Sequence, residues 1–433
     1  MTALAQRFTH RQYLIFLIAL IGVVRILTFA FVLPLDNENL DNLWVALPES
    51  VVAGEGYQGC DPNYFFTCTE PQPTAAREPG NVLFYALLFK VFGQEIGVIF
   101  IAQVLLDMLT GWFAYQIARR IFQPKWIGLA VVAVWAVYLP AISVTGQYYW
   151  SPLATMFMGL FVLSLVWALE RRDSYRRILL SGVAFGLLCL TRTPNEFSIM
   201  LLIPALLLAR RSGWTQRLLY AGAFTAAFVV MLSPWVIRNY IEFKAFIPTT
   251  TLNGYNIFRH TQVIEEPDTL WYGNVPDSII KLQERAGDRL YVGMSEVELN
   301  NIFMDEGLKI IAKYPDRYLQ LSLSRVADGW FNIRPAQFYE QNILATAFTI
   351  IVNGVLWLFA IPALFITLER WLERGWPLLL MLLFSTVIYL PVSIQMHYLI
   401  PVAPFLFMFA AYGWHVIRQS RHLWSQSTAV STS

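Results

Sequence analysis

Long apolar stretches constrain this chain more than any other feature of its sequence. A helix needs about 20 apolar residues to cross the hydrocarbon core of a bilayer, and runs such as 13–34 and 95–118 reach that length. Only 14% of the residues are charged, whereas soluble domains carry about 25%. The sequence therefore predicts an all-α polytopic membrane protein. The ten predicted spans are 13–34, 95–118, 127–145, 151–169, 177–191, 195–209, 217–236, 344–368, 376–393 and 398–417.

For two apolar segments, the sequence does not show directly whether they cross the membrane. The stretch 177–209 is broken by the polar run 191–196, so it forms either two tight crossings or a re-entrant hairpin. The segment 81–93 is apolar but too short to cross, and we expect an interfacial helix there.

Basic residues fall in every second loop, which fixes the predicted orientation because cytoplasmic loops are enriched in Lys and Arg. Both termini then face the cytoplasm, and the segments 35–94 and 237–343 lie outside. The net charge of +2 gives no reason to expect a nucleic-acid partner. The basic residues are Arg7, Arg11, Arg119, Arg120, Lys125, Arg171, Arg172, Arg176, Arg177, Arg210, Arg211, Arg217, Arg370, Arg374, Arg418 and Arg421.

The chain divides into four predicted parts. The second outer segment carries turn signals at Asn253-Gly254 and Pro276-Asp277 and a predicted helical pair over 295–313 and 315–331. The Ser/Thr-rich end is expected to be disordered. The parts are an N-terminal transmembrane module with the first outer loop (1–236), an extracytoplasmic segment (237–343), C-terminal transmembrane helices (344–424) and the tail (425–433).

Buried charge and cysteine give two further predictions. Arg25 and Asp107 lie inside predicted spans, and because an unpaired charge at membrane depth costs roughly 2.5–3.5 kcal/mol on insertion scales, we expect each to have a partner. A structural pair of the two is favoured, and a catalytic role is the alternative. Cys60 and Cys68 lie close together in the first outer loop. An oxidising compartment would favour a disulfide between them, and two free thiols are the alternative.

Ionisable residues gather at the predicted outer boundary. Asp36 and Asp41 follow the first span, where a partly buried carboxylate can act as a general base on a hydroxyl; a solvated loop is the alternative. Arg77 precedes the short helix, and its guanidinium suits either a phosphate or a lipid headgroup. Cations on the same predicted side could hold a lipid phosphate, or could simply snorkel. They are Arg192, Arg238 and His397.

Six segments in order resemble the GT-C superfamily of glycosyltransferases, and glycosyltransferase family 39 with its bacterial relatives in particular. Those relatives include protein mannosyltransferases and the aminoarabinose transferase of lipid A. Residues 47–57 resemble a first-loop helix ending in Gly-x-Gly-Tyr, 77–88 resemble Arg-x-Pro-Gly-Tyr-Pro-Leu-Phe, 186–192 resemble Gly-Leu-x-x-Leu-Thr-Arg, 234–240 with 253–256 resemble Pro-Trp-x-x-Arg-Asn and Gly-Tyr-Asn, 314–319 resemble His-Pro-x-x-Tyr, and 397–404 resemble Arg-Tyr-x-x-Pro-x-x-Pro.

The resemblance implies roles for individual residues. By spacing, Asp41 matches the family's first-loop acid, with Asp36 as the fallback, and Arg77 falls in the phosphate-binding loop. Three positions depart from the family pattern: Val82 replaces a Pro, Ser151 stands where many relatives carry a Glu, and His397 replaces an Arg. An inverting single displacement needs no second carboxylate as nucleophile, so it tolerates Ser151.

The resemblance also implies an activity. The chain would move a sugar from a polyprenyl-phosphate donor to an acceptor hydroxyl of a glycan, lipid or protein, on the outer side of a bacterial inner membrane. The donor phosphate would lie against Arg77, and further against Arg192, Arg238 or His397. The residues imply no further cofactor and leave a divalent metal undecided. The alternatives are a non-catalytic lipid-linked sugar flippase or binding relative, and a small-solute transporter; the absence of a visible internal repeat argues against the last.

Overall fold

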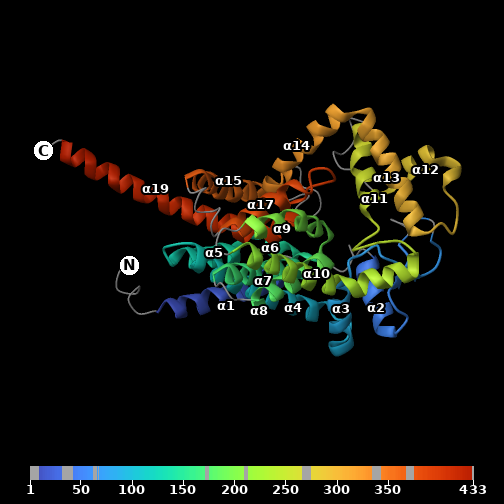
Figure 1. Cartoon of the computed structure of the whole chain (residues 1–433), viewed down its shortest axis with the longest axis horizontal. Helices are drawn as coiled ribbons and strands as arrows, with labels where there is room; N and C mark the ends of the chain where they lie inside the picture. The colour runs from blue at the N-terminus through green and yellow to red at the C-terminus, as the bar shows by residue number, and fades with distance from the viewer. Residues whose placement is uncertain are drawn as a thin grey trace.

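The fold is a bundle of long helices with a smaller helical region at one end (Figure 1). The computed structural model describes residues 9–31, 42–61, 66, 68–170, 175–208, 213–265, 275–333, 343–366 and 375–431. Within these ranges, six helical segments are long and apolar enough to cross a membrane. They are α1 (His10–Phe31), α4 (Ile96–Ile121), α7 (Ser151–Glu170), α10 (Trp214–Phe243), α15 (Ile343–Ile366), and Met396–Ser420, which comprises α18 (Met396–Leu399), η5 (Ile400–Val402) and most of α19 (Ala403–Ser431).

The other four predicted spans contain shorter helices. A proline-containing break at Tyr138 divides 127–145 into two helices, and the run that begins at Arg192 separates α8 from the next short helices. The six long segments are thus established, and the count of ten crossings stays a prediction. The shorter helices are α5 (Trp126–Val137), α6 (Leu139–Val144), α8 (Tyr175–Thr191), η1 (Thr193–Ser198), α9 (Ile199–Leu208) and α17 (Trp376–Val387).

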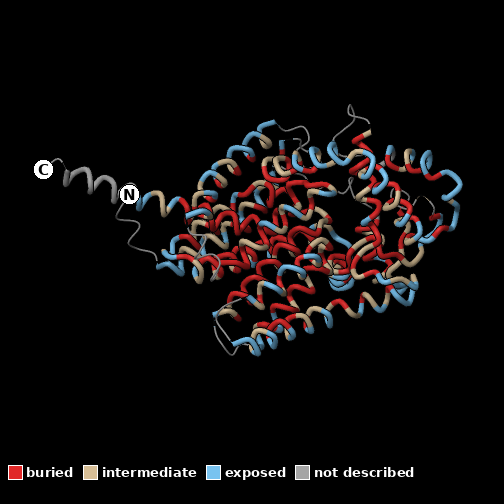
Figure 2. Tube along the Cα trace, turned by 45° about the horizontal axis from the view of Figure 1, so that its top comes forward, coloured by how far each residue is buried: buried red, intermediate tan, exposed pale blue. Residues whose placement is uncertain are grey.

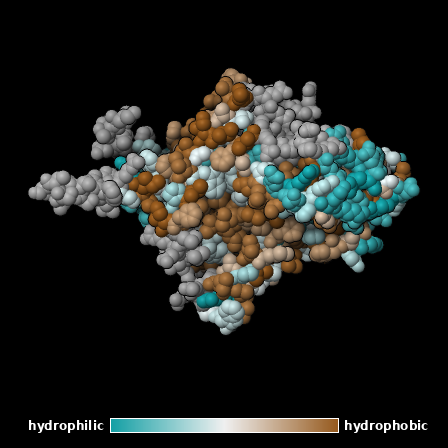
Figure 3. Space-filling model, turned by 90° about the horizontal axis from the view of Figure 1, so that it is seen from above, coloured by the Kyte–Doolittle hydropathy of each residue, from teal (hydrophilic) through white to brown (hydrophobic). Residues whose placement is uncertain are grey.

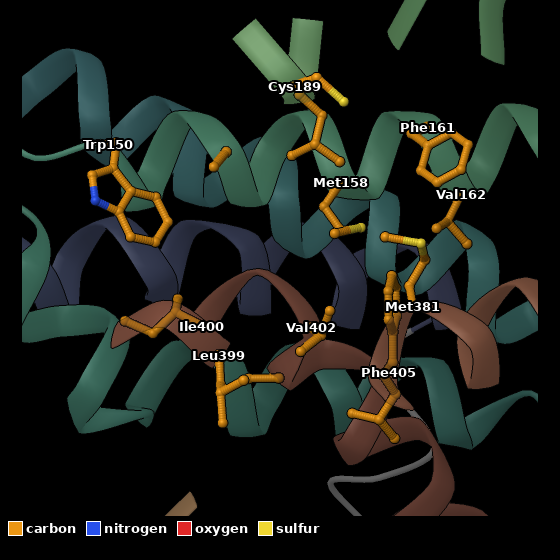
Figure 4. Close-up of a cluster of buried hydrophobic side chains, with 14 of the residues drawn as sticks. Trp150, Met158, Phe161, Val162, Cys189, Met381, Leu399, Ile400, Val402 and Phe405 are labelled. Carbon is orange, nitrogen blue, oxygen red and sulfur yellow. The ribbon is translucent and has the colours of Figure 1, made fainter. Parts of the chain in front are cut away.

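The core of the bundle lies where α7 packs between α4 and α8, with α10 on the other side of α8. Figure 2 shows buried residues concentrated along the inner helices. The close-up in Figure 4 shows Met158 and Phe161 of α7 near Cys189 of α8, with Met381 and Phe405 on the opposite side. Helices α1 and α15 expose many large apolar side chains, as expected of helices that face lipid.

A buried ion pair joins the first two long helices. The Arg25 guanidinium donates a hydrogen bond to the Asp107 carboxylate, and the Thr145 hydroxyl donates to the same carboxylate at 2.9 Å. Arg25 is fully buried and Asp107 is 2% exposed. The pairing predicted from the cost of charge at membrane depth is therefore confirmed.

The first outer segment is compact where it is described. It contains α2 (Asn42–Ala53), a two-residue antiparallel pair of β1 (Gln58–Gly59) with β2 (Gln72–Pro73), and α3 (Pro79–Phe92), the helix predicted over 81–93. Cys60 and Cys68 form a disulfide with their Cα atoms 5.9 Å apart. The pairing that the sequence left open is thus confirmed.

The second outer segment forms a small helical region. The predicted helical pair is confirmed as α13 (Glu296–Lys313) and α14 (Pro315–Phe331). The turns expected at Asn253 and at Pro276-Asp277 were wrong, because both sites open helices instead. A side chain at Gly254 would come within 2.0 Å of the Asn300 carbonyl oxygen, so this glycine serves helix packing rather than a turn. The other elements are α11 (Asn253–Thr261), η2 (Gln262–Ile264), α12 (Val275–Ala286) and η3 (Gly287–Arg289).

The two ends of the molecule differ in polarity. The start of α1 and the far end of α19 lie at one end, and α2, α3 and α11 to α13 lie at the other (Figure 1). Figure 3 shows polar surface gathered at the end that holds α11 to α13 and apolar surface around the middle. Helix α19 runs to Ser431, so its backbone is helical over most of the tail for which disorder was expected.

Candidate functional site

The family-like motifs meet at the polar end of the bundle, around the loop that precedes α3. Tyr57, at the end of the Gly-x-Gly-Tyr segment, donates a hydrogen bond from its hydroxyl to the Arg77 carbonyl oxygen at 2.8 Å. The Arg77 guanidinium lies 5.2 Å from the centre of the Trp44 ring, near the start of α2. A cation over an indole face is attracted by the ring, so α2 and Tyr57 together place Arg77.

Arg77 lies in a partly desolvated, charged environment. Burial lowers the pKa of Arg77 to about 10; the carboxylate of Glu78 opposes this shift, and the positive charge of Arg192 adds a smaller contribution to it. Arg77 therefore stays charged at neutral pH. Because the charge of Arg192 acts on Arg77, two of the predicted cations lie in the same region of the structure.

Glu78 connects the Arg77 loop to the Arg192 loop. Its carboxylate accepts hydrogen bonds from the Thr193 backbone N–H at 3.1 Å and from the Thr193 hydroxyl at 2.9 Å. Two residues further on, in the first turn of α3, a side chain at Gly80 would lie 2.5 Å from the Thr191 hydroxyl. Only a glycine lets the two segments approach so closely. Glu78 and Gly80 therefore keep the Arg77 loop and the Arg192 loop in contact.

Arg192 is held against aromatic rings. Its guanidinium lies 4.2 Å from the centre of a Trp150 ring, 4.5 Å from that of Tyr398 and 5.3 Å from that of Tyr389. The Nε also donates to the Tyr389 hydroxyl at 3.2 Å. Aromatic faces orient a guanidinium while they use few of its N–H donors. Arg192 is therefore held in place in a way that leaves N–H groups able to bind an anion.

His397 belongs to the same aromatic cluster. Its ring centre lies 5.0 Å from that of Tyr149 and 4.4 Å from that of Tyr398, and the side chain is buried. Its carbonyl oxygen accepts from the Ser151 hydroxyl at 3.3 Å. Ser151, where the resemblance implied an acid, is thus a buried serine that contacts the backbone of the 397–404 motif.

Arg238 binds backbone carbonyl groups of the loops around Arg77. Its guanidinium donates to the carbonyl oxygens of Thr74 at 2.7 Å and Tyr57 at 2.8 Å. Neighbouring residues of the same motif bind the loop that follows α10: Trp235 donates to the Thr249 carbonyl oxygen at 2.8 Å, and Asn239 donates to that of Ile247 at 3.0 Å. The Pro-Trp-x-x-Arg-Asn segment therefore joins the outer loops to one another.

Asp36 and Asp41 lie outside the described residues. Helix α2 begins directly after Asp41 in the chain, and its Trp44 is the residue stacked on Arg77. Within the part of the chain that the structure describes, no group of three or more His, Cys, Asp or Glu could hold a metal ion.

Sequence reasoning missed the residues that organise the site. Glu78 and Glu296 are buried carboxylates that bind loop segments, and Tyr389 and Trp150 flank Arg192 from distant parts of the chain. Only Glu78 had a local signal, because it stands inside the Arg77 motif. The others are recognisable only when the helices are packed.

Comparison with known proteins finds a family model that matches part of the chain. Residues 76–237 match the dolichyl-phosphate-mannose-protein mannosyltransferase family. The resemblance to the GT-C glycosyltransferases of family 39 is confirmed. The matched stretch begins one residue before Arg77 and includes Glu78, Arg192 and Trp235.

Two curated relatives support the family. They are undecaprenyl phosphate-alpha-4-amino-4-deoxy-L-arabinose arabinosyl transferases of Pseudomonas aeruginosa, from strains LESB58 and UCBPP-PA14. They are 28% and 27% identical to this chain over 152 residues, which is 34% of this chain and 27% of each relative. The chain is thus matched over about a quarter of the length of these relatives.

The fold is similar to that of a solved oligosaccharyltransferase. An archaeal oligosaccharyltransferase, AglB from Archaeoglobus fulgidus, solved with an inhibitory peptide and a dolichol-phosphate, superimposes with a TM-score of 0.60 at 14% identity. The match covers 98% of this chain and 52% of AglB. A second structure of the enzyme from this organism gives a TM-score of 0.58 at 13% identity, over 96% of this chain and 50% of that one. The chain is a multi-pass integral membrane protein with a GT-C-like fold.

Proposed function

We propose that this glycosyltransferase-family protein transfers a sugar from a polyprenyl-phosphate donor to an acceptor hydroxyl at the outer surface of a bacterial inner membrane. The single observation that carries the proposal is that Arg77 and Arg192 lie in two loops that Glu78 joins through its hydrogen bonds with Thr193, at the polar end of the bundle. Both lie within the stretch that matches the mannosyltransferase family. In this proposal the chain crosses the membrane ten times, with both termini in the cytoplasm.

The donor phosphate is assigned to Arg77 and Arg192. Guanidinium groups bind phosphate oxygens through paired N–H donors, and aromatic rings lie against both of these groups. His397 adds a ring to the same cluster. Arg238 has a supporting role in this proposal, because its guanidinium N–H groups donate to two backbone carbonyl oxygens.

The base is assigned to Asp41, with Asp36 as the second choice. Asp41 is three residues from Trp44 in the chain, and three residues span at most about 11 Å. Because Trp44 is stacked on Arg77, an acid at this point is within reach of the phosphate site. The acceptor oxygen attacks the anomeric carbon with inversion, its proton passes to the aspartate, and the bond to the phosphate oxygen breaks. The arginines stabilise the polyprenyl phosphate that leaves.

The test is a transfer assay on the purified protein in lipid nanodiscs. A panel of polyprenyl-phosphate sugars is offered with candidate acceptors, and the products are identified by mass spectrometry, with and without EDTA. Removing a general base slows catalysis by roughly 10²–10⁴-fold. Asp41→Asn should therefore lose transfer by that factor while still binding the donor, and Glu298→Gln, which changes an exposed carboxylate of α13, should not.

The same variants separate this proposal from its alternatives. A flippase would move the labelled lipid between leaflets in the Asp36→Asn/Asp41→Asn double variant as fast as in the wild type. A small-solute transporter would accumulate solute in proteoliposomes without any polyprenyl phosphate. Either result, with no transfer by the wild-type protein, would refute the enzymatic proposal.

A further inference from the structure

We infer that Glu296, in the outer helical region, is a positioning residue for Arg77. Glu296 opens α13 and lies more than 200 residues from the Arg77 loop in the chain. The role assigned to Arg77 rests on the proposed function, whereas the contact between Glu296 and its loop does not.

The Glu296 carboxylate is buried and fully engaged. It is 4% exposed. One oxygen, Oε2, accepts a hydrogen bond from the Thr74 hydroxyl at 2.7 Å. The other, Oε1, accepts from the Ala75 backbone N–H at 2.7 Å and from the Thr251 hydroxyl at 2.5 Å. We call these four residues, Glu296, Thr74, Ala75 and Thr251, the Glu296 latch.

The segment after α10 completes the support of the same backbone. The Thr251 N–H donates to the Ala75 carbonyl oxygen at 3.1 Å, and the Thr250 hydroxyl donates to that of Ala76 at 3.0 Å. Residues 74–76 are thus bound through their amides and carbonyl groups, and Arg77 is the next residue. Ala75 and Ala76 are almost fully buried.

A second anchor, near the end of α10, holds the same loop. Arg238 of α10 donates to the Thr74 and Tyr57 carbonyl oxygens, and the Tyr57 hydroxyl donates to the Arg77 carbonyl oxygen. The Glu296 latch and Arg238 therefore fix the Arg77 backbone from two different parts of the fold.

This arrangement fits a positioning role better than simple packing. Burying a carboxylate is costly unless hydrogen bonds compensate it, and an apolar residue would fill the same space without that cost. A misplacement of about 1 Å in a binding group can change the rate by roughly 10²-fold. Because Glu296 binds the residues directly before Arg77, it links the outer helical region to the placement of the phosphate site.

The experiment compares three variants of the full-length protein in nanodiscs. Glu296→Ala removes the three hydrogen bonds. Glu296→Gln can restore them, because its carbonyl oxygen accepts from Ala75 and Thr251 while its amide donates to the Thr74 hydroxyl. Glu306→Ala is the matched control: Glu306 is equally buried on the same helix, but its partners are Arg285, Arg289 and Lys309.

Two readouts follow: hydrogen exchange of the amides in 74–78, and the affinity for undecaprenyl phosphate. We expect Glu296→Ala to speed that exchange at least tenfold and to weaken binding tenfold or more, Glu296→Gln to restore both, and Glu306→Ala to change neither. Unchanged exchange in Glu296→Ala, or faster exchange with unchanged binding, would overturn the positioning role. If the wild type binds no undecaprenyl phosphate, the proposed function fails, and the exchange data alone then decide whether the latch exists.

Discussion

The buried pair of Arg25 with Asp107 allows a quantitative test of how the bundle is held together. Both side chains are almost completely excluded from solvent. Replacing Asp107 with leucine would remove the acceptor of the Arg25 guanidinium and of the Thr145 hydroxyl. A guanidinium at membrane depth would then have no counter-charge.

The expected loss of stability follows from the burial of the Arg25–Asp107 pair. Removing one partner of a buried ion pair costs about 3–5 kcal/mol, because the other charge is left uncompensated. Replacing both partners with apolar residues is often neutral, because it removes both desolvation penalties together. Arg25→Leu and Asp107→Leu should therefore each destabilise the protein, and the double variant should recover most of the loss.

The measurement is the free energy of unfolding in mixed detergent micelles, taken for the wild type, both single variants and the double variant. The control is Glu170→Leu, which breaks the partly exposed pair with Arg120 at 3.8 Å and should cost about 0–1 kcal/mol. If the free energy of unfolding fell in the double variant by the sum of the losses in the two single variants, the two residues would not be coupled. That result would refute the reasoning.

Three further predictions concern the outer end of the bundle. Gly80→Ala should displace α3 and weaken undecaprenyl phosphate binding, because the new methyl group would lie 2.5 Å from the Thr191 hydroxyl. Replacing Cys60 and Cys68 with serine should cost about 2.5 kcal/mol by loop entropy for a separation of 8 residues, measured by thermal unfolding. Burial raises the pKa of Glu296 from 4.5, so the folded state favours its protonated form, and hydrogen exchange in 74–76 should speed up as the pH rises above 4.5.

Each of these predictions has its own control. Gly97→Ala adds a methyl group where no atom lies within 4 Å and should leave binding unchanged; equal loss in both glycine variants would contradict the close-approach argument. Reducing agent should reproduce the cysteine effect in the wild type and have no effect in the double serine variant. Glu296→Gln mimics the protonated carboxyl group, so its exchange in 74–76, corrected for intrinsic amide chemistry, should not depend on pH. A parallel pH dependence in that variant would rule out Glu296 as the titrating group.

The sequence by itself determined the membrane character and the family resemblance. Apolar runs of about 20 residues need a bilayer wherever they fold, so the long helices were predictable from local composition. The pairing of Arg25 with Asp107 was predictable for the same reason, because few partners are available at that depth. Short motifs in a fixed order were sufficient to point to the GT-C glycosyltransferases.

The tertiary structure alone decided which residues surround the cations. Trp150 and Tyr389 contact Arg192 from two distant parts of the chain, and Glu296 binds the loop beside Arg77 across more than 200 residues. Each of these residues has an ordinary local context, so no pattern of spacing distinguishes it from a belt aromatic or a surface acid. Their roles depend on long-range packing, which a local sequence pattern does not encode.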